Sequence, residues 1–378
     1  DSVASRGLGD VYKRQAKMGE VLTNSQIGGR RNIAYNGAMN VAQRSTSVTG
    51  LGASSGYFTL DRFKLAPSST AGRLTMAQES ITDLPGFANA MKFTCTTADT
   101  SIAAGETLLL RQFFEGQDLQ QLKKGTSSAE EFTISFYVKG NANATYMVEV
   151  YDGDNTRNNT QQFAVTSSWN RISLTFAADT TGAFNDDNTL SLYLNFWLHA
   201  GSNFTSGTYT ANTWGSPTDA NRAVGISSFF SSTDNTFFLT GLQMEVGSQA
   251  TPFEHRSFGE ELALCQRYCL DLTPVADTAY PYISGTGAVA NSTITVLHNS
   301  FPVEMRTTPT VVMSGTAGDY YIYNGGAIQV TAFQANGLSP RGGGINFSVS
   351  SGVSAGQAAG VYTCLLYTSD AADDLLCV

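Results

Sequence analysis

Alternation of apolar and polar residues is the dominant pattern in this sequence. In the stretch FTISFYVKG (132–140), every second residue from Phe132 to Val138 is apolar. The stretch TYMVEVYD (145–152) alternates in the same way after a short Asn-Ala-Asn-Ala segment. A period of two places the apolar side chains on one face of a β-strand, because successive side chains point to opposite faces. The two stretches therefore predict a β-hairpin with one buried face.

Further stretches have the length and composition of strands. They are 57–65, 73–80, 89–97, 106–114, 170–178, 189–200 and 235–246. No helical period occurs among them, and the segments between them are loops. About nine strands with this spacing predict an all-β fold, an antiparallel jelly-roll β-sandwich over residues 30–255.

The period changes in the segment SFGEELALCQRYCL (257–270). Ser257 followed by Glu260 is a capping-box pattern, which marks the start of a helix. Apolar residues then recur at helical spacing, at Leu262, Cys265, Cys269 and Leu272. We expect one short helix in a connector that spans residues 256–273.

A second run of strand-like sequence occupies residues 274–363. It contains the dipeptides Asn324-Gly325 and Asn336-Gly337, which are typical of tight hairpin turns. The pattern predicts a second, smaller β-domain after the helix.

The two ends of the chain resemble translated sequencing adapters. The segment CLLYTS (364–369) can be encoded by the reverse complement of the transposon end used to build sequencing libraries. The segment SRGLGDVYKRQ (5–15) can be encoded by the opposite adapter followed by the same transposon end. We therefore expect that residues 1–15 and 364–378 are not native, that residues 16–29 are a linker, and that the second β-domain is truncated.

Composition narrows the classes of function. Only 14% of the residues are charged, and the net charge is −9. An acidic chain without a basic cluster is a poor nucleic-acid binder, because neutralisation of phosphates supplies most of that affinity. No apolar run approaches the roughly 18 residues of a membrane span, so membrane insertion is not expected. The three cysteines outside the predicted adapters make no disulfide framework, so stability must come from packing and from oligomerisation.

Two segments resemble a known family. The stretch NIAYNGAMNVAQRSTS (32–47), followed by YFTLDRFKL (57–65), is similar to the opening of a domain of tail-fibre and receptor-binding proteins of tailed bacteriophages. The stretch TGLQMEVGSQATPFEHRSFGEELALCQRYC (240–269) resembles the end of that domain, so the resemblance covers roughly residues 31–272. It implies a carbohydrate-binding-module-like jelly roll on an extracellular virion tail fibre, a homotrimer, and a role in host attachment. It assigns no ligand-binding residues.

The stretch TLSLYLNFWLHAG (189–201) is the best candidate for a binding site. One face of this strand is wholly apolar, while the other carries aromatic and amide side chains. Aromatic rings offer a flat apolar surface to a sugar, and amide, phenol and imidazole groups bond its hydroxyls. The candidate carbohydrate-binding residues on this face and in the following loop are Tyr193, Asn195, Trp197, His199, Tyr209 and Trp214. In the alternative, a long loop or a neighbouring subunit covers this face.

The segment YDGDNTRNN (151–159) is a weak candidate for a metal site. Asp152, Asp154 and Asn155 have the spacing that begins many calcium loops, so a structural Ca²⁺ is conceivable, although no other cofactor is implied. The rest of an EF-hand is absent, and Asp-Gly is also an ordinary hairpin turn, which is the favoured interpretation.

Other metal sites find less support. Cys265 and Cys269 lie one helical turn apart, but no second pair completes a zinc site, which favours buried thiols. Cys95 fits a core strand position. The histidines His199, His255 and His298 are far apart in the sequence, and no pair has metal-ligand spacing.

The sequence contains no convincing catalytic constellation. Its adjacent acidic pairs, such as Asp186-Asp187, would point to opposite faces of a strand, and no nucleophile elbow or phosphate loop occurs. We therefore expect a non-enzymatic virion tail-fibre component that binds a host cell-surface glycan. The alternatives are a purely structural fibre or decoration protein and, less favoured, a polysaccharide depolymerase.

Overall fold

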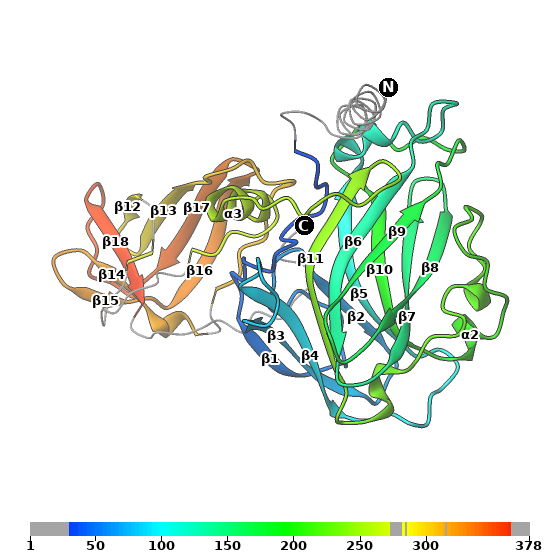
Figure 1. The fold of residues 1–378 in the computed structure, drawn as a ribbon. Coiled ribbons are helices and arrows are strands. Elements are labelled where there is room, and N and C mark those ends of the chain that lie inside the picture. Colours follow the sequence, from blue (N-terminus) through cyan, green and yellow to red (C-terminus); the bar gives the residue numbers. More distant parts are fainter. Residues whose placement is uncertain (1–29, 273–281, 284–285, 314–315, 364–378) are drawn as a thin grey trace, which may run out of the picture.

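The structure is a computed structural model in which the described residues are 30–272, 282–283, 286–313 and 316–363. The predicted adapter segments and the predicted linker lie outside this part of the chain. The described residues form a larger and a smaller β-unit, with a short helix between them in the sequence (Figure 1).

The larger unit is a sandwich of two antiparallel sheets (Figure 1). The six-stranded sheet has the order β1 (Ser47–Leu51), β3 (Arg73–Ser80), β4 (Asn89–Thr97), β11 (Thr236–Val246), β6 (Phe132–Gly140) and β9 (Asn170–Phe176). The five-stranded sheet has the order β2 (Lys64–Ser68), β5 (Thr107–Glu115), β10 (Leu190–Ala200), β7 (Ala144–Asp152) and β8 (Arg157–Val165). The predicted all-β jelly-roll sandwich is confirmed.

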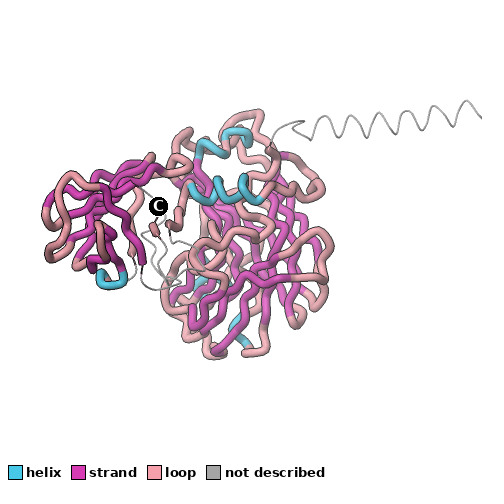
Figure 2. The backbone as a smooth tube through the Cα atoms, turned by 90° about the vertical axis from the view of Figure 1, so that its left-hand side faces the viewer, coloured by secondary structure: helices cyan, strands magenta, loops and turns pink. Residues whose placement is uncertain are grey.

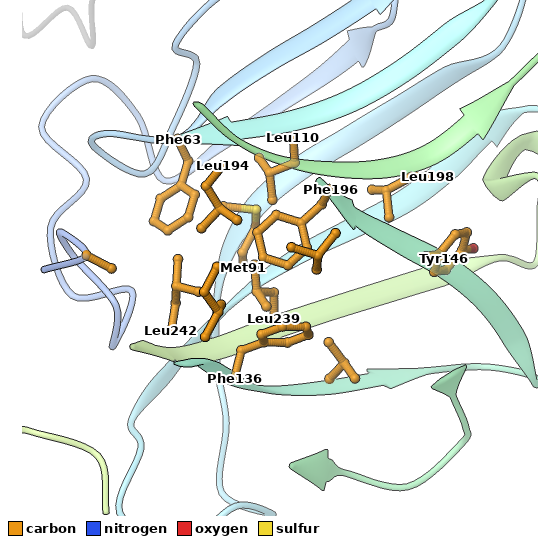
Figure 3. Packing of buried hydrophobic residues seen from close by; sticks show 14 of the residues in the cluster. Phe63, Met91, Leu110, Phe136, Tyr146, Leu194, Phe196, Leu198, Leu239 and Leu242 are labelled. Atoms are coloured by element: carbon orange, nitrogen blue, oxygen red, sulfur yellow. The ribbon is translucent and has the colours of Figure 1, made fainter. Parts of the chain in front are cut away.

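The main core lies between the two sheets. Figure 3 shows Leu194, Phe196 and Leu198 of β10 packed in one cluster with Phe136 and Leu239 of the opposite sheet. Each of these side chains is at most 1% exposed. A fully buried Leu or Phe contributes about 1.5–3 kcal/mol, so this layer is the principal source of stability.

The predicted hairpin between 132–140 and 145–152 is wrong. Both stretches are strands, but β6 pairs with β11 and β9, whereas β7 pairs with β10 and β8. The short segment 141–143 therefore carries the chain from one sheet to the other. Alternation could not distinguish the two cases, because hairpin strands and strands that face each other across a sandwich both bury one face.

Two strands of the sandwich, β1 and β8, were not predicted from the sequence. Most of β8 is polar, and only its last residues, Phe163 and Val165, show the apolar alternation of a core strand. In the predicted strand 57–65, only the end from Lys64 is extended, as part of β2. Arg62 just before it has a φ of 72°, in the left-handed region, which interrupts an extended chain.

The predicted helix and its cap are confirmed. Helix α3 spans Phe258–Gln266, and the Ser257 hydroxyl accepts a hydrogen bond from the Glu260 N–H at 3.3 Å. The helix ends before Cys269 and Leu272, so these two residues do not share its face as predicted.

The buried face of α3 is also different from the predicted one. Glu261 and Cys265 are its buried residues. The Glu261 carboxylate accepts a hydrogen bond from the Asn36 N–H at 2.6 Å and lies 3.3 Å from the Arg256 guanidinium. The Glu261 carboxylate can be buried because Asn36 and Arg256 supply its hydrogen bond and its opposite charge. The spacing of apolar residues does not reveal such a buried charged residue.

The smaller unit is a seven-stranded antiparallel sheet with its own core. Its strand order is β15 (Ala327–Gln329), β14 (Tyr320–Tyr323), β18 (Ala358–Thr363), β12 (Thr286–Asn291), β13 (Ile294–Ser300), β17 (Gly342–Ser348) and β16 (Ala332–Ser339). Figure 2 shows that both units consist almost entirely of strands and loops. Among the described residues, no helix is long and apolar enough to span a membrane.

Only one of the two predicted Asn-Gly turns is a turn between strands. Asn324-Gly325 joins β14 to β15, with Gly325 at a φ of 75°. Asn336-Gly337 instead lies inside β16, at an irregularity in its pairing with β17, and Gly337 has a φ of 58°. An extra residue in a strand needs the same left-handed backbone as a turn, so the dipeptide alone does not locate the hairpin.

Hydrogen bonds connect the smaller unit to the sandwich. The backbone N–H of Arg306 donates to the carbonyl of Arg267, just after α3, at 2.9 Å. The Asn188 side-chain amide donates to the Arg306 carbonyl at 2.7 Å, and the Arg306 guanidinium donates to the Asn188 carbonyl at 3.0 Å. The loop before β10 and the segment just after α3 therefore make polar contacts between the units.

Candidate functional site

The outer face of the five-stranded sheet carries three of the predicted site residues. On β10, Tyr193, Asn195 and Trp197 point away from the main core, because their neighbours Leu194 and Phe196 point into it. Strand pairing places each of them between a residue of β5 and a residue of β7. Three rows result: Phe113–Tyr193–Tyr151, Arg111–Asn195–Glu149 and Leu109–Trp197–Met147.

The row through Trp197 is covered, and we call it the covered half of the face. Trp197 is 1% exposed and clusters with Ala66, Leu109 and Met147. The segment that follows β10 lies over it: Phe204, Tyr209 and Ile226 pack against this cluster, with the Phe204 ring centroid 5.3 Å from that of Trp197. Trp197 is therefore a residue of a second small core.

Three predicted contact residues are too buried to touch a ligand in this structure. Trp197 is 1% exposed, Asn195 is 2% exposed and His199 is 0% exposed. The expectation that these side chains form an open surface is wrong, and the loop-covered alternative describes them correctly. The physical reason is the apolar content of the segment after β10, which buries the aromatic face next to it.

A buried carboxylate organises the middle row. Glu149 accepts hydrogen bonds from Asn195 Nδ2 and Trp197 Nε1, each at 2.9 Å. Arg222, from the covering segment, donates to both carboxylate oxygens at 2.8 and 3.0 Å. Burial raises the pKa of Glu149, but the Arg222 charge and these hydrogen bonds outweigh it, so the pKa lies below its ordinary value. Glu149 is thus a fixed anion that clamps the covering segment onto the sheet.

The row through Tyr193 remains partly exposed, and we call it the open half of the face. Phe113, Tyr193 and Tyr151 are each partly exposed and come from three neighbouring strands. The Tyr193 ring centroid lies 5.1 Å from that of Phe113 and 5.5 Å from that of Tyr151, both in edge-to-face geometry. Gly153 lies beside Tyr193, where an added Cβ would come within 2.9 Å of its ring. The result is a continuous strip of three rings across the sheet.

Polar groups border the open half. The Arg222 guanidinium lies 5.5 Å from the Tyr151 ring centroid. In the adjacent row, Arg111 Nε and Asn195 Oδ1 are buried and have no hydrogen-bond partner among the described residues. Burial raises the pKa of Tyr193, with Tyr151 and Asp154 adding to the rise and Arg111 opposing it, so the phenol is neutral and can donate a hydrogen bond. Rings and hydrogen-bonding groups therefore occur together.

Tyr209 and Trp214 do not join the Tyr193 row. The Tyr209 hydroxyl accepts a hydrogen bond from the backbone N–H of Gln162 at 3.0 Å, and its ring packs on the covered half. Trp214 Nε1 donates to the carbonyl of Ala177 at 2.7 Å, and its ring packs against the main core. Both residues anchor the covering segment.

The three calcium candidates meet in the turn between β7 and β8. Asp152 accepts hydrogen bonds from the backbone and side chain of Asn155 at 3.0 Å. Its carboxylate lies 2.5 Å from Lys124 Nζ, which supplies the positive charge that a cation would bring. Asp154 accepts a hydrogen bond from the Asn185 N–H at 3.0 Å. These contacts stabilise a turn through hydrogen bonds and an ion pair. They give no support to a calcium site.

The cysteines behave as buried thiols where the structure describes them. Cys95 and Cys265 are buried and Cys269 is partly buried, and none of the three forms a disulfide among the described residues. Burial raises the pKa of Cys265, which keeps the thiol protonated. Among the described residues, neither Cys265 nor Cys269 belongs to a group of three potential metal ligands. The zinc interpretation is therefore not supported.

Sequence analysis missed Phe113, Tyr151, Glu149 and Arg222. The alternation in 145–152 puts Glu149 and Tyr151 on the face opposite Val148 and Val150, so for these two residues a signal was present. The stretch 106–114 has no clear alternation that would place Phe113 on a face. What the sequence did not contain was the strand order, which brings β5 and β7 to either side of β10. Arg222 lies in an irregular segment for which no periodicity exists.

No protein-family model matches this chain, and neither does any curated protein. Among solved structures, the chain is similar to a CBM4 domain, with 10% identity, a TM-score of 0.30, and coverage of 56% of this chain and 98% of that one. It is similar to the enzymatically active domain of tailspike protein 4 of bacteriophage CBA120, with 9% identity, a TM-score of 0.28, and coverage of 57% and 21%. It is also similar to a family 11 carbohydrate-binding module of a Clostridium thermocellum cellulase, with 14% identity, a TM-score of 0.26, and coverage of 54% and 99%. At these TM-scores the similarity carries no argument about what this chain binds.

Proposed function

We propose that this chain binds carbohydrate without catalysis, through the open half of the outer face. The observation that carries the proposal is the strip of Phe113, Tyr193 and Tyr151, three partly exposed rings at one register on neighbouring strands. Flat apolar rings suit the C–H face of a pyranose, and the adjoining phenol and guanidinium groups suit its hydroxyls. The proposed ligand is a surface polysaccharide rather than an apolar molecule, because polar groups border the strip.

The biological setting belongs to the proposal as well. The resemblance of 32–47 and 240–269 to phage tail-fibre domains supports an extracellular virion component that attaches to a host cell-surface glycan. A single shallow sugar site binds weakly, and linking several copies raises the apparent affinity by roughly 10²–10⁴ without new contacts. A homotrimeric fibre would use the site in this way.

The non-catalytic part of the proposal is supported by the state of Glu149. A glycosidase needs a carboxylic acid with a raised pKa beside the scissile bond. Glu149, in the row next to the strip, has a lowered pKa, is 0% exposed and is saturated by hydrogen bonds. It cannot donate a proton to a bound glycan.

The test is a binding screen of the whole chain against bacterial surface polysaccharides, with a double variant, Tyr151→Ala/Tyr193→Ala. A matched control is Trp169→Ala, which removes a partly exposed ring from the outer side of the six-stranded sheet, where it lies 6.1 Å from Phe238. We expect binding by the wild type and by the control, and none by the double variant. Binding lost in the control but kept in the double variant would move the site to the other sheet. Release of reducing ends from a bound polysaccharide would contradict the non-catalytic role.

A further inference from the structure

A cluster of three potential metal ligands lies at one end of the sandwich, away from the ring strip. Asp99 follows β4, Glu106 immediately precedes β5, and His199 is near the end of β10. One ligand atom from each lies within 4.8 Å of the other two. Their exposures are 6%, 5% and 0% respectively. The cluster therefore joins both sheets of the sandwich in a place that water hardly reaches.

Among the described residues, no Lys or Arg side chain forms an ion pair with the carboxylates of this cluster. Among the ion pairs of the described residues, the one that involves Glu106 joins it to His199 at 3.2 Å, and none involves Asp99. No Lys or Arg side chain therefore compensates the two buried carboxylates. Burying an anion is costly unless a cation lies beside it, and two such anions near each other raise that cost further. A bound cation would remove the imbalance.

Each ligand is held in place by a second residue. Asp99 Oδ2 accepts hydrogen bonds from the Thr70 hydroxyl and the Ala71 N–H, both at 2.8 Å. His199 Nδ1 lies 2.8 Å from the Ser228 hydroxyl, which leaves Nε2 facing Glu106 Oε2 at 3.2 Å. Metal-binding histidines commonly use the other ring nitrogen for an orienting hydrogen bond of this kind.

We propose that Asp99, Glu106 and His199 bind a divalent first-row transition cation, with Zn²⁺ the best-fitting example. Two ligands of one tetrahedral Zn²⁺ are about 3.3 Å apart, because Zn–N and Zn–O bonds are about 2.0–2.2 Å long. The separation of 3.2 Å between His199 Nε2 and Glu106 Oε2 agrees with this value. An imidazole beside two carboxylates favours Zn²⁺ or Mn²⁺ over Ca²⁺, which prefers six to eight oxygen ligands.

The cation would act as a structural cross-link. It would tie the segment after β4 to the start of β5 and the end of β10, and thus hold one sheet to the other at this end. His199 lies on β10 one residue before its end, just ahead of the segment that covers Trp197, so the cation would also fix where that segment departs from the sheet. This site is separate from the proposed glycan site and does not depend on it.

The experiment is metal analysis and thermal unfolding of the untagged full chain, purified with Zn²⁺ and then treated with a chelator. We expect about one Zn²⁺ per chain, and a Tm that falls by about 5–10 °C on chelation and recovers on addition of Zn²⁺. Absence of retained zinc together with an unchanged Tm would overturn the proposal. A Tm that responds to Ca²⁺ but not to Zn²⁺ would overturn the assignment to a transition cation.

Three variants locate the cation. Asp99→Asn and Glu106→Gln keep the shape of each side chain, and His199→Gln keeps its approximate size, but each change weakens a ligand. We expect the Zn²⁺-dependent rise in Tm to disappear in each variant. The controls are Asp234→Asn and His298→Gln, which change exposed residues and should keep the full rise. Without metal, Asp99→Asn and Glu106→Gln should melt no lower than the wild type, because each removes a buried carboxylate that no Lys or Arg pairs with. Undiminished Zn²⁺ binding by all three variants would place the metal elsewhere and overturn the proposal.

Discussion

The covered half and the open half of the outer face differ in solvent exposure although both carry aromatic residues. Trp197 and Tyr193 are both aromatic, lie four positions apart on β10, and point to the same side of the sheet. Trp197 is enclosed by Phe204, Tyr209 and Ile226, whereas Tyr193 stays partly exposed between Phe113 and Tyr151. An aromatic residue on the outer face of a strand is therefore part of a core where the following segment covers it. Where that segment leaves it exposed, it is available for binding.

The covering segment is held by charge as well as by apolar contact. Arg222 pairs with Glu149 and also lies 5.1 Å from the Trp197 ring centroid, so one side chain contacts both the middle row and the covered half. The same guanidinium borders the open half at Tyr151. Arg222 thus lies at the boundary between the two halves. We expect substitutions in the covered half to affect stability more than substitutions in the open half.

The largest expected effect is on folding, from Trp197→Ala. Removal of a fully buried indole leaves a cavity and deprives Glu149 of a hydrogen-bond donor, so we expect the free energy of unfolding to fall by about 3–5 kcal/mol. Denaturant unfolding measures this loss. If Trp197→Ala proved as stable as the wild type but failed to bind glycan, the covered half would have to be open in solution.

The next largest effect is expected from Arg222→Met. This change leaves the buried Glu149 carboxylate without its cation, and breaking one partner of a buried pair destabilises by about 3 kcal/mol. The double variant Glu149→Gln/Arg222→Met should recover part of the loss, because it removes the stranded charge. Equal stability of the single and double variants, measured by denaturant unfolding, would show that the ion pair does not clamp the segment.

A smaller effect on the free energy of unfolding is expected when the pH is lowered. The pKa of Glu149 in the folded chain lies below its ordinary value of 4.5, so its ionisation stabilises the fold above that value. This contribution is lost as the pH falls through the lowered pKa of the folded state. We expect the stability of the wild type to fall more steeply below about pH 4.5 than that of Glu149→Gln. Parallel pH profiles of the two proteins would contradict the assignment.

The smallest effect on folding is expected from Tyr193→Ala, in the open half. Its ring is partly exposed and makes two edge-to-face contacts, each of which is worth about 0.5–1.5 kcal/mol. We expect a loss of about 1 kcal/mol in the free energy of unfolding, well below that of Trp197→Ala. A loss of stability as large as that of Trp197→Ala would contradict the claim that Tyr193 lies outside the covered core.

The strands could be predicted from the sequence because burial of one face imposes a period of two. The pattern and composition of the strand-like stretches located β3, β4, β5, β6, β7, β9, β10 and β11, and the capping pattern at Ser257 located α3. Alternation failed at β8, where the residues are mostly polar, and at the turn 141–143, where a change of sheet has the same local pattern as a hairpin.

The site could be predicted only in part, for a related reason. The sequence identified the outer side of β10, but it did not distinguish Tyr193 from Trp197, because exposure depends on residues such as Phe204 and Arg222 that are distant in the chain. Long-range order also explains why His199 was dismissed as a metal ligand. Its partners Asp99 and Glu106 are near each other in the sequence but about a hundred residues away from it, and the fold brings them together.

The most direct test of the account is the dissociation constant of a polysaccharide identified in the screen, measured by calorimetry for the wild type, Tyr193→Ala and Trp169→Ala. We predict that Tyr193→Ala binds at least about tenfold more weakly, which is a loss of roughly 1.4 kcal/mol, while Trp169→Ala binds like the wild type. An unchanged dissociation constant for a folded Tyr193→Ala, with weakened binding by Trp169→Ala, would contradict the account.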